Sequence, residues 1–417
     1  MTKHPIVFLT AGTRGDIQPL VALARGLHER AAPARFVTHT PFRTLVESAG
    51  LPFAPLGGDL NTLLQPATAE GAFAVGGNPV RSLVAGVRYL HQAQPVFTRM
   101  IADAWRQCRD AGALILSLPT LWGAQIAEAL DIPCGYALLQ PLSPTAAFPT
   151  PFSPWNSTAG AFNRWSHQLL LRALWLPWRS ALARWRRDTL GLRSPAPRDP
   201  LVASEQRAIP WLYGISPQVL LRPDDWPTTH HLTGYWFLDS DHGWQPPRAL
   251  AAFLASGPPP IYVGFGSMGG LSARELRIVL AACATSGVRV IIAGAAPAEL
   301  PPWAFALAPT PHDWLFPQVA LVIHHGGAGT TAAALRAGVP QIIAPVAVDQ
   351  HFWGRRVAAM RVGPPPRPHR QLTANWLIGA IAAAQVSEIK HAAATLGQAV
   401  RAERGVEVAV ERLGHWL

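Results

Sequence analysis

Two short apolar runs, far apart in the chain, each end in a glycine-rich turn that leads directly into a helix-forming stretch. The first is Pro5–Ala11 with the turn Gly12-Thr-Arg-Gly-Asp16, and the second is Ala320–Ile323 with the turn His324-His-Gly-Gly-Ala-Gly329. A buried strand that passes through a tight turn into a helix is typical of a parallel sheet covered by helices on both faces. The sequence therefore predicts an α/β protein.

The same alternation of strand and helix fills both halves of the chain. Further strands are expected at Ala34–Thr38, Ala113–Ser117, Pro133–Leu139, Pro260–Gly266, Val288–Ala293 and Gln341–Pro345. Because 417 residues are enough for two domains, we predict two doubly wound, Rossmann-like domains. We place the first at 1–215, a linker rich in Pro, Asp, His and Gly at 216–256, the second at 257–400, and a final helix at 401–417.

Composition excludes several classes of protein. Hydrophobic residues make up 49% of the chain and charged residues 14%, which excludes a disordered protein. The net charge of +11 comes almost entirely from arginine, which suits an anionic partner or reflects an arginine bias of the genome, and both explanations stay open. The three cysteines are widely spaced, so we expect neither a disulfide framework nor a zinc module. We expect a cytoplasmic protein, soluble or peripheral at a membrane, without a signal peptide, a spanning helix or a nucleic-acid partner.

The segment 161–193 stands apart because it holds seven arginines and a single acid, Asp188, with tryptophans and leucines interleaved. The simpler interpretation is a pair of helices that pack their tryptophans inward and leave their arginines solvated. The alternative is a basic amphipathic surface that contacts a membrane.

The turn after Ile323 has the features of a phosphate site. Its glycines let the backbone approach a ligand closely, and the free N–H groups and the dipole at the helix start favour a phosphate. His325 can donate a hydrogen bond to a diphosphate, and Thr330 and Thr331 can add hydroxyl contacts. The lysine of a Walker loop is missing from this turn.

A dinucleotide site is a rival interpretation of the same turn, because Gly327–Ala332 fits GxGxxA and Asp349 follows about 20 residues later. The His-His pair argues against it, since an apolar strand end is expected there. Gln350 also argues against it, because it follows Asp349 directly and starts a helix. An NAD(P)-dependent oxidoreductase stays open as an alternative activity.

Asp16 lies at the start of the first predicted helix, where a carboxylate caps free backbone N–H groups. The same place, beyond the carboxyl end of a strand, is where open α/β sheets hold their ligands. Asp16 is therefore also a candidate general base. The turn by itself leaves both roles open.

Four segments, taken together and in this order, are very specific. They are Gly12–Leu27 (GTRGDIQPLVALARGL), Gly257–Met268 (GPPPIYVGFGSM), Pro311–Pro340 (PHDWLFPQVALVIHHGGAGTTAAALRAGVP) and Asp349–Val357 (DQHFWGRRV). Through them the chain resembles the inverting GT-B glycosyltransferases of family 1, the UDP-glycosyltransferase superfamily. Within it, the chain is most similar to sterol 3β-glucosyltransferases and to bacterial glycosyltransferases of glycopeptides and other natural products.

The resemblance implies an architecture and assigns roles to single residues. An N-terminal acceptor domain and a C-terminal nucleotide-sugar domain would face a cleft, with the final helix packing back on the first domain. Asp16 corresponds to the catalytic base. The positions implied to bind the donor are Thr13, Arg14, Ser267, His312, His325, Gly327, Ala328, Gly329, Thr330, Asp349 and Gln350. Ala333 stands where plant members have a ribose-binding glutamate, so both UDP- and dTDP-linked sugars stay open.

The implied reaction moves a hexose from a UDP- or dTDP-linked sugar to a hydroxyl of a hydrophobic acceptor, such as a sterol, a natural product or a lipid alcohol. The resemblance implies no metal and no cofactor besides the nucleotide-sugar co-substrate. The DxD pattern Asp239-Ser-Asp241, by which other glycosyltransferases hold manganese, is expected to be a solvated part of the linker. A nucleotide-sugar-binding auxiliary protein without transfer activity is the second alternative.

Overall fold

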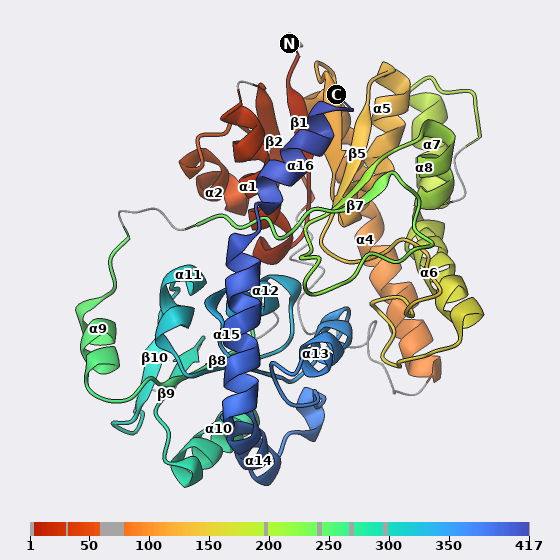
Figure 1. Cartoon of the computed structure of the whole chain (residues 1–417). Coiled ribbons are helices and arrows are strands. Elements are labelled where there is room, and N and C mark those ends of the chain that lie inside the picture. Colours follow the sequence, from red (N-terminus) through yellow and green to blue (C-terminus); the bar gives the residue numbers. More distant parts are fainter. Residues whose placement is uncertain are drawn as a thin grey trace. The chain divides into compact units, whose positions relative to one another are not determined.

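The structure is a computed structural model of the chain (Figure 1). It describes residues 4–30, 32–58, 79–195, 199–239, 244–266, 271–294 and 299–416, with the backbone alone for 79–92. The chain forms two compact units, one made of Met1–Leu238 together with Arg404–Leu417 and the other of Asp239–Glu403. Each unit has its own parallel sheet and its own core.

The first unit is built on a seven-stranded sheet in which every pair is parallel. Its strands, in the spatial order β3-β2-β1-β4-β5-β6-β7, are β1 (Ile6–Leu9), β2 (Ala34–Thr38), β3 (Phe53–Pro55), β4 (Ala113–Leu116), β5 (Cys134–Leu138), β6 (Trp211–Tyr213) and β7 (His230–Leu232). β1 and β4 are buried at every residue, as strands covered on both faces must be.

Helices cover the faces of this sheet (Figure 1). They are α1 (Arg14–His28), α2 (Arg43–Ser48), α4 (Pro79–Cys108), α5 (Ala124–Leu130), α6 (Gly160–Trp175), α7 (Arg179–Asp188), α8 (Pro200–Arg207) and α16 (Gly405–Gly414), with the 3₁₀ turns η1 (Thr40–Phe42), η3 (Leu118–Gly123) and η4 (Leu176–Trp178). α16 packs closely on α1, because a Cβ at Gly26 would lie 2.4 Å from Val406 Cγ1. Leu23 and Leu413 from these two helices share one buried cluster.

The second unit repeats the architecture with a five-stranded parallel sheet in the order β10-β9-β8-β11-β12. Its elements are α9 (Arg248–Ala255), β8 (Ile261–Gly264), α10 (Ala273–Ser286), β9 (Val290–Ala293), β10 (Ala304–Leu307), α11 (His312–Leu315), η5 (Phe316–Gln318), β11 (Leu321–His324), α12 (Ala328–Ala337), β12 (Gln341–Ile343), α13 (Gln350–Ala359), η6 (His369–Gln371), α14 (Ala374–Ala384) and α15 (Ser387–Ala402). Val263 and Tyr262 belong to two different buried clusters, since neighbouring residues of a strand point to opposite faces.

The predicted α/β class and the predicted parallel sheets are confirmed, and the structure adds strands that the pattern did not reveal. These are β3, β6 and β7, with three residues each, and β10, with four. β7 lies inside the segment 216–256 that we expected to be linker, and it pairs with β6 in the first unit.

In each sheet the strand order reverses at one place. This switch point lies between β1 and β4 in the first unit and between β8 and β11 in the second. Open α/β sheets bind their ligands outside the carboxyl ends of the strands at such points. The two glycine-rich turns follow β1 and β11, so the fold brings both of them to a switch point.

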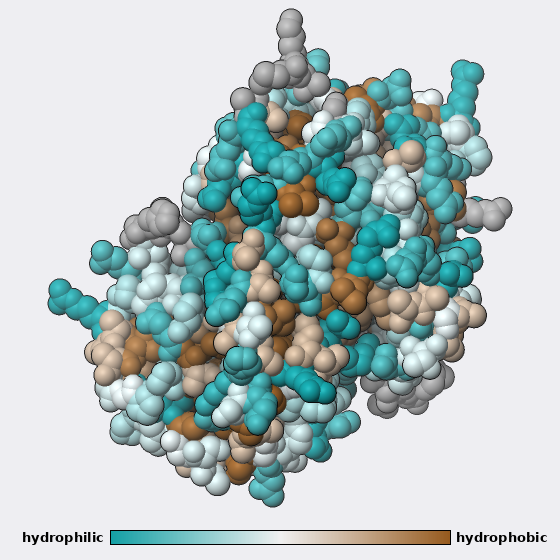
Figure 2. Space-filling model, viewed as in Figure 1, coloured by the Kyte–Doolittle hydropathy of each residue, from teal (hydrophilic) through white to brown (hydrophobic). Residues whose placement is uncertain are grey.

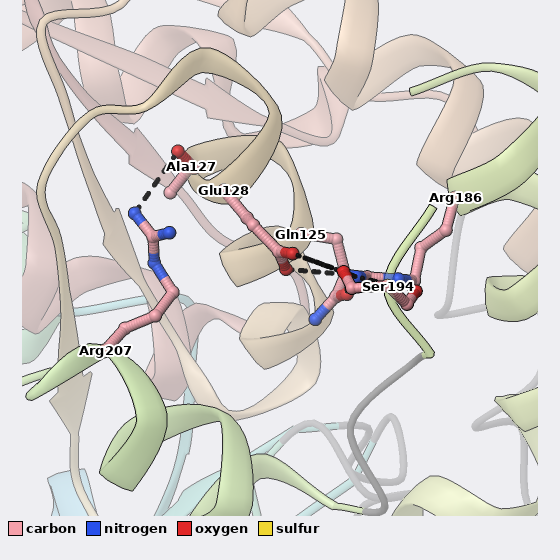
Figure 3. A network of polar contacts seen from close by, with 6 residues as sticks. All are labelled: Gln125, Ala127, Glu128, Arg186, Ser194 and Arg207. Atoms are coloured by element: carbon pink, nitrogen blue, oxygen red, sulfur yellow. Dashed lines mark hydrogen bonds and ion pairs between the residues drawn. The ribbon is translucent and has the colours of Figure 1, made fainter. Parts of the chain in front are cut away.

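A buried arginine ties α7 to α5 (Figure 3). The Arg186 side chain is only 2% exposed, and its two terminal nitrogens donate to Glu128 Oε2 and Oε1 over 2.6 and 2.9 Å. Gln125 Oε1 accepts a further hydrogen bond. Ser194 Oγ accepts from Arg186 at 2.7 Å and donates to Glu128 Oε1 at 3.0 Å. These acceptors bond to both terminal nitrogens of the guanidinium and provide a negative charge beside it, which offsets the cost of burying its positive charge.

This network corrects part of the interpretation of 161–193 as a helix pair with inward tryptophans and solvated arginines. Trp175 and Trp185 are buried, as that interpretation expects. Arg186 is buried as well, and Trp165 is 53% exposed, so the interpretation is wrong at these two residues.

We expect Arg186→Met to lower the free energy of unfolding by about 3 kcal/mol, because Glu128, whose side chain is 25% exposed, would keep a partly buried charge without its cation. Burial raises the pKa of Glu128, but the hydrogen bond and charge of Arg186 outweigh it and hold this pKa below its usual 4.5. The contribution of the pair should therefore be lost as the pH falls through that lowered pKa.

Urea-induced unfolding measures the effect. Arg187→Met is the matched control, because Arg187 is 68% exposed and pairs with the neighbouring Asp188. It should change the free energy of unfolding by less than about 0.5 kcal/mol. Equal effects of the two substitutions would contradict the account of a buried ion pair.

Candidate functional site

The turn after β1 holds Asp16 at the start of α1. Gly12 has a φ of 127°, and a Cβ there would lie 2.6 Å from Asp16 Oδ2, so glycine is required on both counts. The backbone N–H and the hydroxyl of Thr13 both donate to Asp16 Oδ2 over 2.9 Å. The predicted capping role of Asp16 is therefore confirmed. Arg14, by contrast, is exposed, and its Nε donates to Gln18 Oε1 over 2.9 Å.

The environment of Asp16 makes its carboxylate more basic. Burial raises the pKa of Asp16 above its usual 3.8, while the hydrogen bonds from the backbone and the side chain of Thr13 oppose part of that rise. A carboxylate with a raised pKa takes a proton more readily than one in water. The same side chain can thus cap the helix and act as a base.

The loop after β4 lies beside this turn, because Leu9 of β1 pairs with Leu116 of β4. Thr120 Oγ1 donates to the Leu9 carbonyl over 2.6 Å and accepts from the Ser117 N–H over 3.0 Å. Thr120 therefore fixes the end of β1, immediately before the turn that carries Asp16. Sequence reasoning missed this residue, although the spacing of Ser117 and Thr120 is that of a capping box.

In the second unit, the turn after β11 holds the His325 ring between two glycines. A Cβ at Gly266 would lie 2.8 Å from His325 Cε1, and a Cβ at Gly327 would lie 2.5 Å from His325 Nε2. Gly266 follows β8, which pairs with β11 so that Gly264 is opposite His324. Glycines at two neighbouring strand ends thus fix the position of the ring. The role of Gly266 was not predicted from the sequence.

His325 is a neutral imidazole at neutral pH. Burial lowers its pKa to about 4, although a hydrogen bond with the backbone of Gly264 opposes part of the fall. α12 begins directly after Gly327, and the first N–H groups of a helix have no partner within it. We expected the Thr331 hydroxyl to contact a ligand. In the structure it donates to the Gly327 carbonyl over 2.9 Å and so stabilises the start of the helix.

His324 holds the same turn from the other side. The Gly326 N–H donates to His324 Nδ1 over 3.0 Å, and His324 Nε2 lies 2.8 Å from Gln341 Oε1. Since a backbone N–H can only donate, Nδ1 is the acceptor and Nε2 carries the proton. Burial and the neighbouring His325 lower the pKa of His324 to about 3, which keeps this arrangement neutral. The interpretation of His324 as a supporting residue agrees with this geometry.

Asp349 and Gln350 lie beside the turn. A Cβ at Gly326 would come within 3.0 Å of the Gln350 carbonyl, and both side chains are buried. The Trp353 indole donates to Asp349 Oδ2 over 2.9 Å. Gln350 Oε1 accepts from two backbone N–H groups of the preceding loop, at 2.7 and 3.1 Å. Trp353, which we expected in the core, is 1% exposed and also orients Asp349.

The loop before Asp349 contains an unusual backbone conformation. Val348 has a φ of 59°, which is rare for a β-branched residue and costs of order 1–3 kcal/mol. Such strain persists where the surroundings fix it, here through the hydrogen bonds of Gln350 to this loop. Strained positions often accompany ligand sites.

The remaining predicted residues are placed as follows. The His312 ring stacks on Phe316 with a centroid distance of 4.3 Å, at the start of α11. Ser267 and Asp241 lie outside the described residues. Asp239 forms an ion pair with Arg336 of α12. Within the described part of the chain, no three His, Cys, Asp or Glu side chains gather as a metal site would require.

The structure therefore gathers most of the predicted donor residues at one switch point. His325, Gly327, Ala328, Asp349 and Gln350 surround the turn between β11 and α12 in the second unit. Asp16 and Thr13 form a separate group at the switch point of the first unit. The first group can bind an anion beside hydroxyl groups, and the second can accept a proton.

Two family models match the chain, one in each half. Residues 6–148 match the glycosyltransferase family 28 N-terminal domain. Residues 281–407 match the erythromycin biosynthesis protein CIII-like C-terminal domain. The first range includes Asp16, and the second includes the whole turn between β11 and α12.

Curated relatives match nearly the whole chain. A sterol 3-beta-glucosyltransferase of Cryptococcus neoformans is 33% identical, and the match covers 98% of this chain and 27% of the relative. Proteins of the same name from Sclerotinia sclerotiorum and Aspergillus oryzae are each 35% identical and covered over 29% and 30% of their lengths. The chain thus spans less than a third of the length of these relatives.

Solved structures share the fold across the full length. The glycosyltransferase of kitacinnamycin matches with a TM-score of 0.72 at 16% identity, covering 100% of both chains. The calicheamicin glycosyltransferase CalG4 matches with a TM-score of 0.69 at 17% identity, covering 100% of this chain and 99% of that one. The predicted GT-B fold is confirmed, and the chain is similar to glycosyltransferases in its N-terminal half and over nearly its whole length.

Proposed function

We propose that the protein is an inverting glycosyltransferase that moves a hexose from a nucleotide sugar to a hydroxyl of a hydrophobic acceptor. The observation that carries this proposal is the turn after β11, where a neutral, glycine-held His325 adjoins the start of α12. Hydrogen-bond donors in this arrangement suit the diphosphate that leaves during glycosyl transfer. The similarity to the glycosyltransferase family 28 N-terminal domain and to sterol 3-beta-glucosyltransferases supports the same reaction.

In the second unit, the donor diphosphate would lie at the start of α12. The N–H groups of Ala328, Gly329 and Thr330, together with the helix dipole, would stabilise its negative charge. His325 Nε2 faces Gly327 and would donate a further hydrogen bond. Asp349, oriented by Trp353, and Gln350 would bind hydroxyls of the sugar. Thr13, Arg14, Ser267 and His312 stay as predicted donor contacts.

In the first unit, Asp16 would act as the general base. Both hydrogen bonds of Thr13 go to Oδ2, so Oδ1 is the atom that would take the proton of the acceptor hydroxyl. A carboxylate remains a far weaker base than an alkoxide, so proton transfer would accompany the attack on the anomeric carbon. One direct displacement inverts that carbon, so an α-linked donor would give a β-glycoside.

The relatives support one class of acceptor as the first to test. Because the relatives at 33–36% identity are sterol 3-beta-glucosyltransferases, a sterol is the first acceptor to test, before other natural products and lipid alcohols. Both UDP- and dTDP-linked hexoses stay in the proposal, since Ala333 offers no carboxylate to the ribose. The three cysteines are free and buried, which fits action in the reducing cytoplasm.

We expect Asp16→Asn to lower the transfer rate by about 10²–10⁴-fold, because the amide keeps the shape of the carboxylate but takes up no proton. The affinity for the nucleotide, carried by the second unit in this proposal, should stay within twofold by titration calorimetry. In the parent enzyme, kcat/KM should fall as the pH drops through the raised Asp16 pKa, above 3.8. Near-normal turnover of the variant would eliminate Asp16 as the base.

We expect Gly327→Ala to weaken nucleotide binding and transfer by about tenfold to a hundredfold, because the new Cβ would lie 2.5 Å from His325 Nε2 and displace the ring. Gly379→Ala in α14 is the matched control, since a Cβ there meets nothing within 4 Å. It should leave binding unchanged. If neither Gly327→Ala nor His325→Ala alters nucleotide affinity, the diphosphate lies elsewhere.

Transfer should continue in the presence of EDTA, because the helix start and His325 can take the charge of the leaving group. The assay uses a panel of UDP- and dTDP-hexoses with sterol acceptors and detects products by mass spectrometry. Activity lost with EDTA and restored by manganese would instead favour a metal site at Asp239 and Asp241.

Calorimetry that gave binding of NADH but not of UDP or dTDP would favour the oxidoreductase alternative. Donor hydrolysis without transfer to any acceptor would favour the auxiliary protein.

A further inference from the structure

Exposed apolar side chains are concentrated in one short part of the first unit. In the part of the chain that the structure describes, nine large apolar side chains are exposed, and six of them lie within residues 155–176. The six are Trp155, Phe162, Trp165, Leu169, Leu174 and Leu176, with exposures between 40% and 69%. Single exposed apolar residues are ordinary, but a concentrated group marks an interaction surface.

The spacing of these residues places most of them on one side of α6. Phe162, Trp165 and Leu169 follow one another at intervals of three and four, which forms a continuous stripe along a helix. Leu176 extends the stripe into η4 at the end of α6. Figure 2 shows apolar atoms next to hydrophilic ones over the part of the first unit that holds α6. We call this stripe the outer face of α6.

The opposite side of α6 is buried and carries both polar and apolar side chains. Asn163, Ser166 and His167 are buried there and bond to the loop before the helix. Asn163 Nδ2 donates to the Ala146 carbonyl over 2.9 Å, and Ser166 Oγ accepts from the Thr150 N–H over 2.8 Å. Leu171 and Trp175, further along α6, are buried as well. α6 therefore has apolar groups on its exposed side in addition to those it buries, which is unusual for a surface helix.

Arginines surround the outer face of α6. Arg164 and Arg172 on α6 are 52% and 65% exposed, although they form ion pairs with Asp225 and Asp199. Arg179 and Arg184 on α7 are exposed as well. Along 161–193 the only acid is Asp188. The result is an apolar stripe flanked by guanidinium groups, which bind phosphate oxygens well.

We propose that the outer face of α6, with the arginines of α6 and α7, docks on the surface of an anionic lipid bilayer. The apolar stripe would enter the boundary between headgroups and acyl chains, and the arginines would contact lipid phosphates. A second copy of the chain fits this face poorly, because a symmetric contact would set arginines against arginines. No helix in the described residues is long and apolar enough to cross a bilayer, so this contact would be peripheral. The inference does not depend on the proposed reaction.

The test is co-sedimentation with vesicles of phosphatidylcholine, with and without phosphatidylglycerol as a third of the lipid. The unchanged protein should bind the anionic vesicles at low salt and lose most of that binding at high salt. Trp165→Gln combined with Leu169→Gln should reduce the partition coefficient by about tenfold or more. Arg179→Gln combined with Arg184→Gln should reduce binding to the vesicles that contain phosphatidylglycerol and leave binding to pure phosphatidylcholine vesicles unchanged.

Val386→Gln is the control variant, since Val386 is an exposed apolar residue of the second unit and should leave vesicle binding unchanged. Thermal unfolding of each variant checks that the fold is intact. Three outcomes would overturn the proposal. The first is an unchanged protein that fails to bind anionic vesicles. The second is that the unchanged protein is a dimer in solution and the variant with Trp165→Gln and Leu169→Gln is a monomer. The third is a changed acceptor KM in that variant with unchanged vesicle binding.

Discussion

The parallel pairing of β8 with β11 is the constraint on which the candidate donor site depends. With Gly264 opposite His324, the two strands end level with one another. Gly266 and Gly327 then come close to the same imidazole from two loops that are far apart in sequence. The position of the His325 ring therefore depends on the register between β8 and β11. A shift of that register by one residue would turn the histidine to the opposite face of the sheet.

The site is further stabilised by hydrogen bonds between buried polar groups. Gln341 orients His324, His324 accepts from the backbone at Gly326, and Gly326 adjoins Gln350. Gln350 in turn holds the loop that contains the strained Val348. Each of these groups is inside the protein, where an unmade hydrogen bond is costly, so the chain of contacts allows few alternative conformations. Such preorganisation benefits charge stabilisation, because donors already in place need not reorganise.

The sequence predicted the class of fold and the position of both turns, because these depend on local patterns. Strands such as 34–38 and turns rich in glycine carry their signal within a few residues. It missed Thr120, Gly266 and Gln341, whose roles arise from contacts across the sheet. It also missed β7, whose His230–Leu232 segment is defined as a strand by its pairing with β6. The sequence also left open whether Asp16 is a cap or a base, since both share one local signature, and the structure shows the cap.

The return of α16 to α1 has a consequence for how the molecule is made. The second unit is inserted into the first, because the chain leaves the first unit after Leu238 and rejoins it at Arg404. During synthesis, all strands of both sheets emerge before α16 does. The surface of α1 that receives Val406 and Leu413 therefore stays uncovered until α16 has been made. The first unit can therefore complete its core only after the second has been synthesised. The contacts between α1 and α16, which are far apart in sequence, form last.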